Sequence, residues 1–184
     1  MIRKVLLLAT VGAAVLTFAT VAPASGAALP HGATCNLAGT ASFTPGLTAK
    51  PNKTGQYSFS GNLTNCAKGT VKVAKPTTGL VSATVNATGH ALGPIGVSCE
   101  AGYTSGNATI GWSTGGSSAV AFKTVSAGAL TLVEGKVGTS SDTDVHTGDL
   151  AAGILAFSTT TPQNCATTGL ASASFQGQTG TGNV

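Results

Sequence analysis

Apolar and polar residues alternate at every second position along much of this chain, and this period predicts β-strands. The first clear example runs from 34 to 43, where Cys, Leu, Gly, Ala and Phe occupy the odd positions. Successive side chains of a strand point to opposite faces, so one row is expected to face a core and the other solvent. Gly or Pro interrupts nearly every stretch of ten residues, and no segment beyond residue 28 combines a helical period with caps. The chain is therefore predicted to be all-β.

A second alternating segment, 56–63, follows a connection rich in Pro, Gly, Asn and Lys, residues that favour turns and solvent. The two segments are predicted to pair as antiparallel strands, with Phe43 opposite Tyr57. The same register, continued to the start of the first strand, leaves Cys35 one residue out of step with Cys66. A single β-bulge would bring these two cysteines within bridging distance.

Cysteine usage predicts two disulfides, because an even number of cysteines in an exported chain usually forms pairs. The four are Cys35, Cys66, Cys99 and Cys165. Sequence alone allows three connectivities. The strand register favours Cys35–Cys66, which leaves Cys99–Cys165 as the second bridge. The sequence separations of 31, 33 and 66 fit no zinc module, and no CxxC occurs.

Further apolar or alternating segments continue the pattern to the C-terminus. Those segments are 71–73, 81–88, 95–101, 108–112, 120–122, 130–132, 150–157 and 171–175. In 95–101 the inward row contains Ile95, Val97, Cys99 and Ala101. The unbroken apolar run 150–157 predicts a central strand that is buried on both faces. Roughly nine or ten short strands indicate an antiparallel β-sandwich, Ig-like or jelly-roll-like, or a flattened barrel, in either case with two disulfides.

The N-terminal segment is typical of an export signal. Arg3 and Lys4 precede an uncharged apolar run from Val5 to about Ala22, and small residues follow before Ala28. We expect residues 1–28 to be cleaved, residues 29–176 to form a single β domain, and residues 177–184 to be a flexible tail. The alternative is an uncleaved membrane anchor, since about 20 apolar residues span a bilayer. With cleavage, the chain is expected to be secreted and to have no stable membrane insertion.

Charge argues against nucleic acid as a partner. The chain has nine basic residues, and removal of Arg3 and Lys4 leaves seven Lys and no Arg, against five acidic residues. Arg is the preferred residue for bidentate contacts with phosphates and bases, and nucleic-acid-binding surfaces cluster basic residues. The one local cluster, Lys68, Lys72 and Lys75, alternates like the solvated face of a strand. With 42% apolar and 8% charged residues, the chain is expected to fold.

Residues suited to acid–base catalysis are scarce, so the chain is predicted not to be an enzyme. There are three His residues and no G-x-S-x-G motif, the turn that carries the nucleophile of many serine hydrolases. Glu100 and Glu134 lie on or beside predicted strands and could face one cleft, as the paired carboxylates of glycoside hydrolases do. Outward projection of each side chain from a sheet is the favoured interpretation. A small secreted hydrolase using Glu100, Glu134 or a His remains an alternative.

The most acidic stretch is 140–149, which contains Asp142, Asp144, Asp149 and His146. Carboxylates at this density are able to ligate a hard cation such as Ca²⁺. The stretch lacks the Glu that ends an EF-hand loop, and a solvated connection between strands is the favoured interpretation. No cofactor is predicted.

Several motifs together resemble small exported four-cysteine proteins of actinobacteria. They are C–x–L–x–G–x–A–x–F–x–P–G–L from Cys35, Y–x–F–x–G–x–L–x–x–C from Tyr57, and G–x–x–x–I–x–W from Gly106, together with the Ala- and Gly-rich export signal. That group has no assigned activity, so the resemblance implies an exported β-sandwich and adds no function. The composition and paired cysteines are also similar, more weakly, to enediyne-carrying apoproteins such as neocarzinostatin.

Two non-catalytic functions follow from these features. The first is an extracellular binding or structural module with an unidentified surface partner. The second is a carrier of a small apolar ligand held between the sheets, for which the candidate lining residues are Trp112, Tyr103, Phe122 and Phe157. The favoured interpretation of these aromatics is that they are ordinary core residues.

Overall fold

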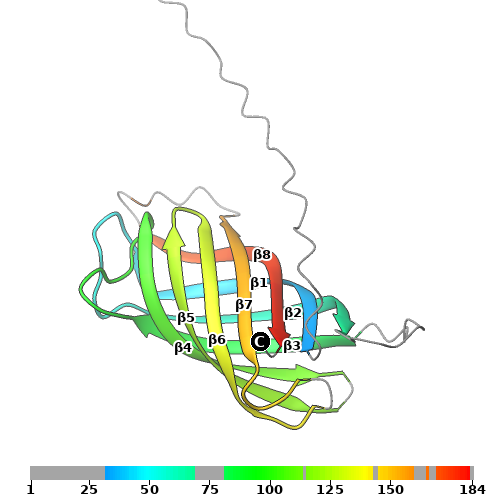
Figure 1. Cartoon of the computed structure of the whole chain (residues 1–184). Helices are drawn as coiled ribbons and strands as arrows, with labels where there is room; N and C mark the ends of the chain where they lie inside the picture. The colour runs from blue at the N-terminus through cyan, green and yellow to red at the C-terminus, as the bar shows by residue number, and fades with distance from the viewer. Residues whose placement is uncertain are drawn as a thin grey trace, which may run out of the picture.

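The structure of the chain is a computed structural model, and it describes residues 32–68, 81–113, 115–142, 145–159, 165 and 169–182. Within these residues, eight antiparallel strands follow one another around a single closed barrel, and the first strand pairs with the last (Figure 1). The strands are β1 (Gly32–Leu47), β2 (Gln56–Lys68), β3 (Val81–Ala91), β4 (Ala101–Trp112), β5 (Ser117–Ala127), β6 (Leu130–Ser140), β7 (Leu150–Ser158) and β8 (Leu170–Gly182).

The prediction of an all-β antiparallel fold with two disulfides is confirmed, whereas the predicted sandwich is wrong and the barrel alternative holds. A sandwich consists of two separate sheets, and each sheet has two edge strands. Here β1 pairs with β2 on one side and with β8 on the other. Closure leaves no unpaired edge, which is the usual advantage of a barrel. Alternation with a period of two predicts which face of each strand is buried. It does not distinguish a sandwich from a barrel, because strands alternate in the same way in both.

The predicted register of β1 and β2 is confirmed, because Phe43 pairs with Tyr57. The pairing shifts between Thr34 and Asn36, which is the irregularity needed at the cysteines. Cys35 and Cys66 are bonded, with their Cα atoms 4.1 Å apart. The second bridge joins Cys99 to Cys165.

The segment 95–101 is not the strand that its alternation predicted. Residues 92–100 form a loop between β3 and β4, in which Val97 is buried but Ile95 is 57% exposed. Gly93 and Gly96 adopt positive φ angles of 71° and 68°, a conformation that interrupts a strand. The alternation was correct for Val97, but the glycines turn the backbone and direct Ile95 to solvent.

β7 is not buried on both faces, which corrects the expectation of a central strand for 150–157. Leu155 is 4% exposed, whereas its neighbour Ile154 is 57% exposed. A barrel has one interior, so every strand turns half its residues outward. β6 follows the same rule, since Thr131 is buried while Leu130 and Leu132 are exposed.

The C-terminal segment is more ordered than expected. Residues 177–182, predicted as part of a flexible tail, belong to β8 and pair with both β7 and β1. The predicted signal segment 1–28, the strand at 71–73 and the lysines 72 and 75 lie outside the described residues. Across the residues that the structure does describe, no helix has the length and apolar character needed to span a membrane.

Candidate ligand cavity

The two ends of the barrel are closed by different parts of the chain. The loops 48–55 and 92–100 and the turn 128–129 gather at one end, which we call the cavity end. The described residues between β4 and β5 (113, 115 and 116) and between β6 and β7 (141, 142 and 145–149) lie at the other end, which we call the plugged end. This separation follows from the antiparallel order, because consecutive connections alternate between the two ends.

A cavity of about 280 Å³ lies inside the cavity end. Its lining comes from β1, β2 and β4 to β8, and from the loop 92–100 and the turn 128–129. The principal apolar side chains are Leu37, Phe43, Phe59, Phe122, Leu155, Phe157 and Phe175. An eight-stranded barrel has an interior just wide enough to be filled by side chains or to hold one small ligand, and this end retains free volume.

Five phenylalanines form one continuous aromatic layer in this lining. Their rings pack in the order Phe43, Phe157, Phe175, Phe59 and Phe122, with neighbouring ring centroids 5.4–6.5 Å apart. Such tilted and edge-on contacts are favourable for aromatic pairs. The five residues come from five different strands, so closure of the barrel is what assembles the layer.

A short chain of hydroxyl groups interrupts this apolar lining. The Tyr57 hydroxyl lies 2.8 Å from Oγ1 of Thr104, which lies 2.6 Å from Oγ1 of Thr124. Nearer to the turn 128–129, the hydroxyls of Ser126 and Thr131 lie 2.8 Å apart. Burial is the largest influence on the Tyr57 phenol and raises its pKa, while the two threonine hydroxyls act in the opposite direction.

A glycine allows Tyr57 to reach this position. Tyr57 is on β2 and Thr104 is on β4, so the side chain must cross β3. Gly89 is paired with Tyr57 on β3, and a Cβ at that position would collide with the tyrosine ring. The absence of a side chain at 89 therefore opens the path of the phenol across the strand.

The loops at the cavity end are tied to one another. Asn52 and Val97 exchange two backbone hydrogen bonds, with N to O distances of 2.8 and 2.9 Å. The Cys99 amide donates to the carbonyl of Thr48 at 3.0 Å. Cys99 lines the cavity and is bonded to Cys165, so this disulfide connects the loop 92–100 to the connection between β7 and β8.

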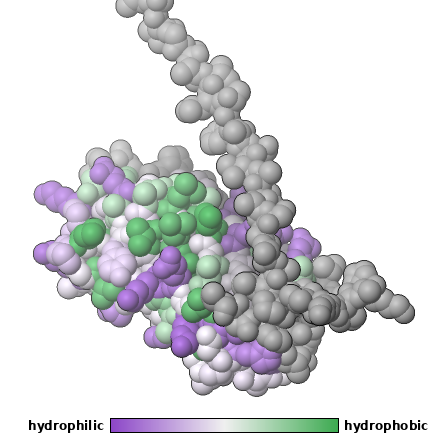
Figure 2. All heavy atoms as spheres, in the orientation of Figure 1, coloured by the Kyte–Doolittle hydropathy of each residue, from purple (hydrophilic) through white to green (hydrophobic). Residues whose placement is uncertain are grey.

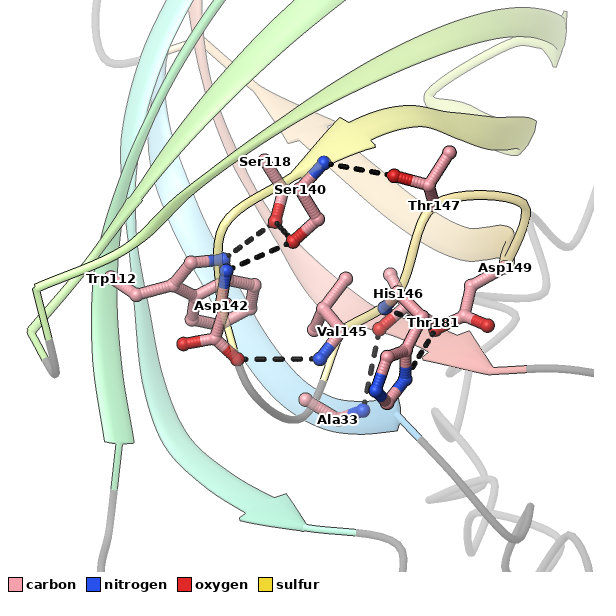
Figure 3. Close-up of polar contacts among 10 residues, drawn as sticks. All are labelled: Ala33, Trp112, Ser118, Ser140, Asp142, Val145, His146, Thr147, Asp149 and Thr181. Atoms are coloured by element: carbon pink, nitrogen blue, oxygen red, sulfur yellow. Dashed lines mark hydrogen bonds and ion pairs between the residues drawn. The ribbon is translucent and has the colours of Figure 1, made fainter.

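The plugged end is filled by side chains (Figure 3). Val145 is 1% exposed, and Trp112 is buried near it. The indole N–H of Trp112 donates to Ser118 Oγ at 2.9 Å, and Ser118 Oγ lies 2.8 Å from Ser140 Oγ. The indole is thereby fixed to the neighbouring strand β5 with its only polar atom satisfied.

Two of the four predicted ligand-lining residues lie at the cavity. Phe122 and Phe157 belong to the aromatic layer. Trp112 belongs to the plugged end instead, and Tyr103 points outward, since its neighbours Gly102 and Thr104 are the inward residues of β4. The sequence analysis overlooked the role of Tyr57, although it paired Tyr57 with Phe43, a residue of the aromatic layer.

Asp142 and Asp149, two of the predicted metal ligands, accept hydrogen bonds from the backbone of their own loop. An oxygen of Asp149 accepts a hydrogen bond from the His146 amide at 2.8 Å, and one of Asp142 accepts from the Val145 amide at 3.3 Å (Figure 3). Asp144 lies outside the described residues. Among the residues that are described, no three His, Cys, Asp or Glu side chains gather into a metal-binding group.

The two candidate catalytic glutamates lie outside the cavity. Glu100 is exposed in the loop 92–100, and Glu134 is exposed on the outer face of β6, opposite Lys123 of β5. Neither contributes to the cavity lining. His90 is also exposed, and its Nε2 lies 3.3 Å from Ser105 Oγ.

The outer face of β5, β6 and β7 carries an apolar patch. It consists of the cross-strand row Val125, Leu132 and Ile154 together with Leu130 and Ala156. Figure 2 shows apolar residues gathered on the face where Figure 1 shows these three strands. The adjoining row contains Lys123 and Glu134, so charges of both signs border the patch.

Comparison of the chain with protein-family models, with curated proteins and with solved structures found no match.

Proposed function

We propose that this protein is a non-catalytic carrier that holds one small, largely apolar molecule inside the barrel. The observation that supports this function is the cavity of about 280 Å³ lined by the five-phenylalanine layer. Ligand sites are typically concave, mainly apolar and supplied with a few polar groups. An apolar cavity of about 150 Å³ is sufficient to bind benzene, so this cavity suits a somewhat larger molecule such as a two-ring aromatic.

The remainder of the molecule is consistent with a carrier that acts outside the cell. The two disulfides indicate an oxidising environment, since such bonds are rare in reducing compartments. The apolar N-terminal segment of the sequence supports export. The outward positions of Glu100 and Glu134 favour binding over hydrolysis, because neither carboxylate faces the cavity.

A cavity-filling substitution tests the carrier function. Ala173 is buried in the cavity lining, so Ala173→Met should occupy part of the space. We expect the variant to weaken binding of an environment-sensitive apolar dye at least tenfold, measured by fluorescence titration. Ala119→Met is the matched control, because Ala119 is exposed on the outer face of β5. Equal dye binding by both variants and the unsubstituted protein would exclude the cavity as the binding site.

A second candidate function is self-association through the outer patch of β5 to β7. The patch is apolar at its centre and bordered by Lys123 and Glu134. Opposite charges beside an apolar centre are self-complementary, because a two-fold axis can bring Glu134 of one copy to Lys123 of another. We expect Leu132→Lys with Ile154→Lys to convert a dimer to a monomer in analytical ultracentrifugation. A monomeric unsubstituted protein at high concentration would reject this candidate.

A further inference from the structure

The chemistry of the ligand is indicated by the hydroxyl chain in the cavity. Tyr57, Thr104 and Thr124 come from β2, β4 and β5, and their hydroxyl groups meet within an otherwise apolar lining. Thr104 and Thr124 are a directly paired cross-strand couple, so their relative position is set by the barrel wall. The three hydroxyls therefore present a fixed polar point beside the aromatic layer.

The hydroxyl chain retains hydrogen-bonding capacity for a ligand. Each hydroxyl supplies one donor and two acceptor lone pairs. Two mutual hydrogen bonds join the three groups, and either atom of each pair is able to donate. Two bonds use two of the three hydroxyl protons, so one donor remains. If both hydrogen bonds reverse direction, that donor moves from one end of the hydroxyl chain to the other.

The lining offers no counter-charge. Within the described part of the chain, every residue that lines the cavity is uncharged. Burial also keeps the Tyr57 phenol protonated at neutral pH, because its pKa lies above the ordinary value of 10.0. A carboxylate or an ammonium group would lose its hydration here without gaining an opposite charge, which is strongly unfavourable.

We propose that the ligand is an uncharged molecule with an apolar body and a carbonyl or hydroxyl group that hydrogen-bonds to the Tyr57–Thr104–Thr124 chain. This assignment rests on the proposed carrier function and narrows it to neutral, mono-functional apolar compounds. The apolar body lies against the phenylalanine layer, and the polar group fixes its orientation. Fatty acids and amines of the same size are disfavoured.

Three compounds with one ring system test this assignment on the full protein. They are naphthalene, 2-acetylnaphthalene and 2-naphthoate, which carry no polar group, a neutral carbonyl and a carboxylate. Calorimetric titration at pH 7 should rank 2-acetylnaphthalene tightest. We expect an advantage over naphthalene of about three- to tenfold, the range for one net hydrogen bond. The carboxylate should bind at least tenfold more weakly than the ketone.

A pair of tyrosine variants locates the interaction. Tyr57→Phe removes only the cavity hydroxyl, and Tyr103→Phe makes the same change on the outer face. Tyr57→Phe should reduce the ketone's advantage to less than twofold, and Tyr103→Phe should leave it unchanged. If Tyr57→Phe fails to fold, Thr124→Val provides the equivalent test.

The possible failures are distinguishable. If none of the three compounds binds, the carrier function itself is wrong. If naphthalene and the ketone bind equally and Tyr57→Phe changes neither, the cavity is a binding site but the hydroxyl chain does not select the ligand. Tighter binding of the carboxylate would also overturn the assignment of a neutral ligand.

Discussion

The two ends of the barrel share the same strands but are closed in different ways. At the plugged end, Trp112 and Val145 fill the bore with side chains. At the cavity end, the loop 92–100 borders the cavity, and it is tied to the loop 48–55 by hydrogen bonds and to Cys165 by a disulfide. Packed side chains leave few voids larger than a water molecule, whereas a loop cover leaves the space beneath it free.

Because of this difference, we expect one end of the barrel to contribute mainly to stability and the other to ligand binding. The plugged end supplies close packing and a satisfied indole. The cavity end is less closely packed, because residues that line free volume make fewer dispersion contacts. Substitutions at the plugged end should therefore change the free energy of unfolding without changing ligand affinity, and substitutions at the cavity end should change both.

The largest expected effect is from Trp112→Ala. Loss of the buried indole should lower the free energy of unfolding by about 3–5 kcal/mol, the range for truncation of a large buried aromatic. Denaturant titration measures the change, and Trp112→Phe should lose less. Dye affinity of the folded fraction should remain within twofold. A large loss of affinity would show that the two ends are coupled.

Removal of each disulfide tests whether the two ends of the barrel act separately. Cys35→Ala with Cys66→Ala, and Cys99→Ala with Cys165→Ala, should each lower the free energy of unfolding by about 2–5 kcal/mol. Only the second pair should accelerate dissociation of a bound dye in stopped-flow fluorescence, because only that bridge joins segments at the cavity end. Equal dissociation rates in the two double variants would contradict the role of the tied loops.

The smallest expected effect is on the pH dependence of the free energy of unfolding. The pKa of Tyr57 is raised in the folded protein, whereas in the unfolded chain it is near 10.0. The folded state thus holds its proton more tightly, and the stability linked to this group is fully present below pH 10 and lost as pH rises through the folded pKa. The unfolding free energy should fall more steeply above pH 10 in the unsubstituted protein than in Tyr57→Phe. Parallel curves would show that the phenol is not buried in solution.

Local pattern predicted the parts of the fold that depend on neighbouring strands. The pairing of Phe43 with Tyr57 and the Cys35–Cys66 bridge both follow from one hairpin and its turn. The outward direction of Ile154 did not follow, because β7 carries apolar residues on both faces and the period of two cannot choose between them. Barrel closure makes that choice by giving the sheet only one interior.

The set of residues that line the cavity depended still more on tertiary structure. Phe122 and Phe157 were identifiable as apolar residues of predicted strands, but Trp112 belongs to the same class and lies at the other end. Composition does not distinguish the two ends. The role of Tyr57 depends on Gly89, through the space that this glycine leaves on the adjacent strand.

Alternation, turn residues and paired cysteines were enough to predict an all-β, antiparallel, cross-linked fold, because these signals act over a few positions at a time. The pairing of β1 with β8, and the meeting of Tyr57, Thr104 and Thr124 in one cavity, depend instead on the folded barrel as a whole. Those contacts join residues far apart in the chain. They exist because the twist and closure of eight strands bring inward rows together around a single interior.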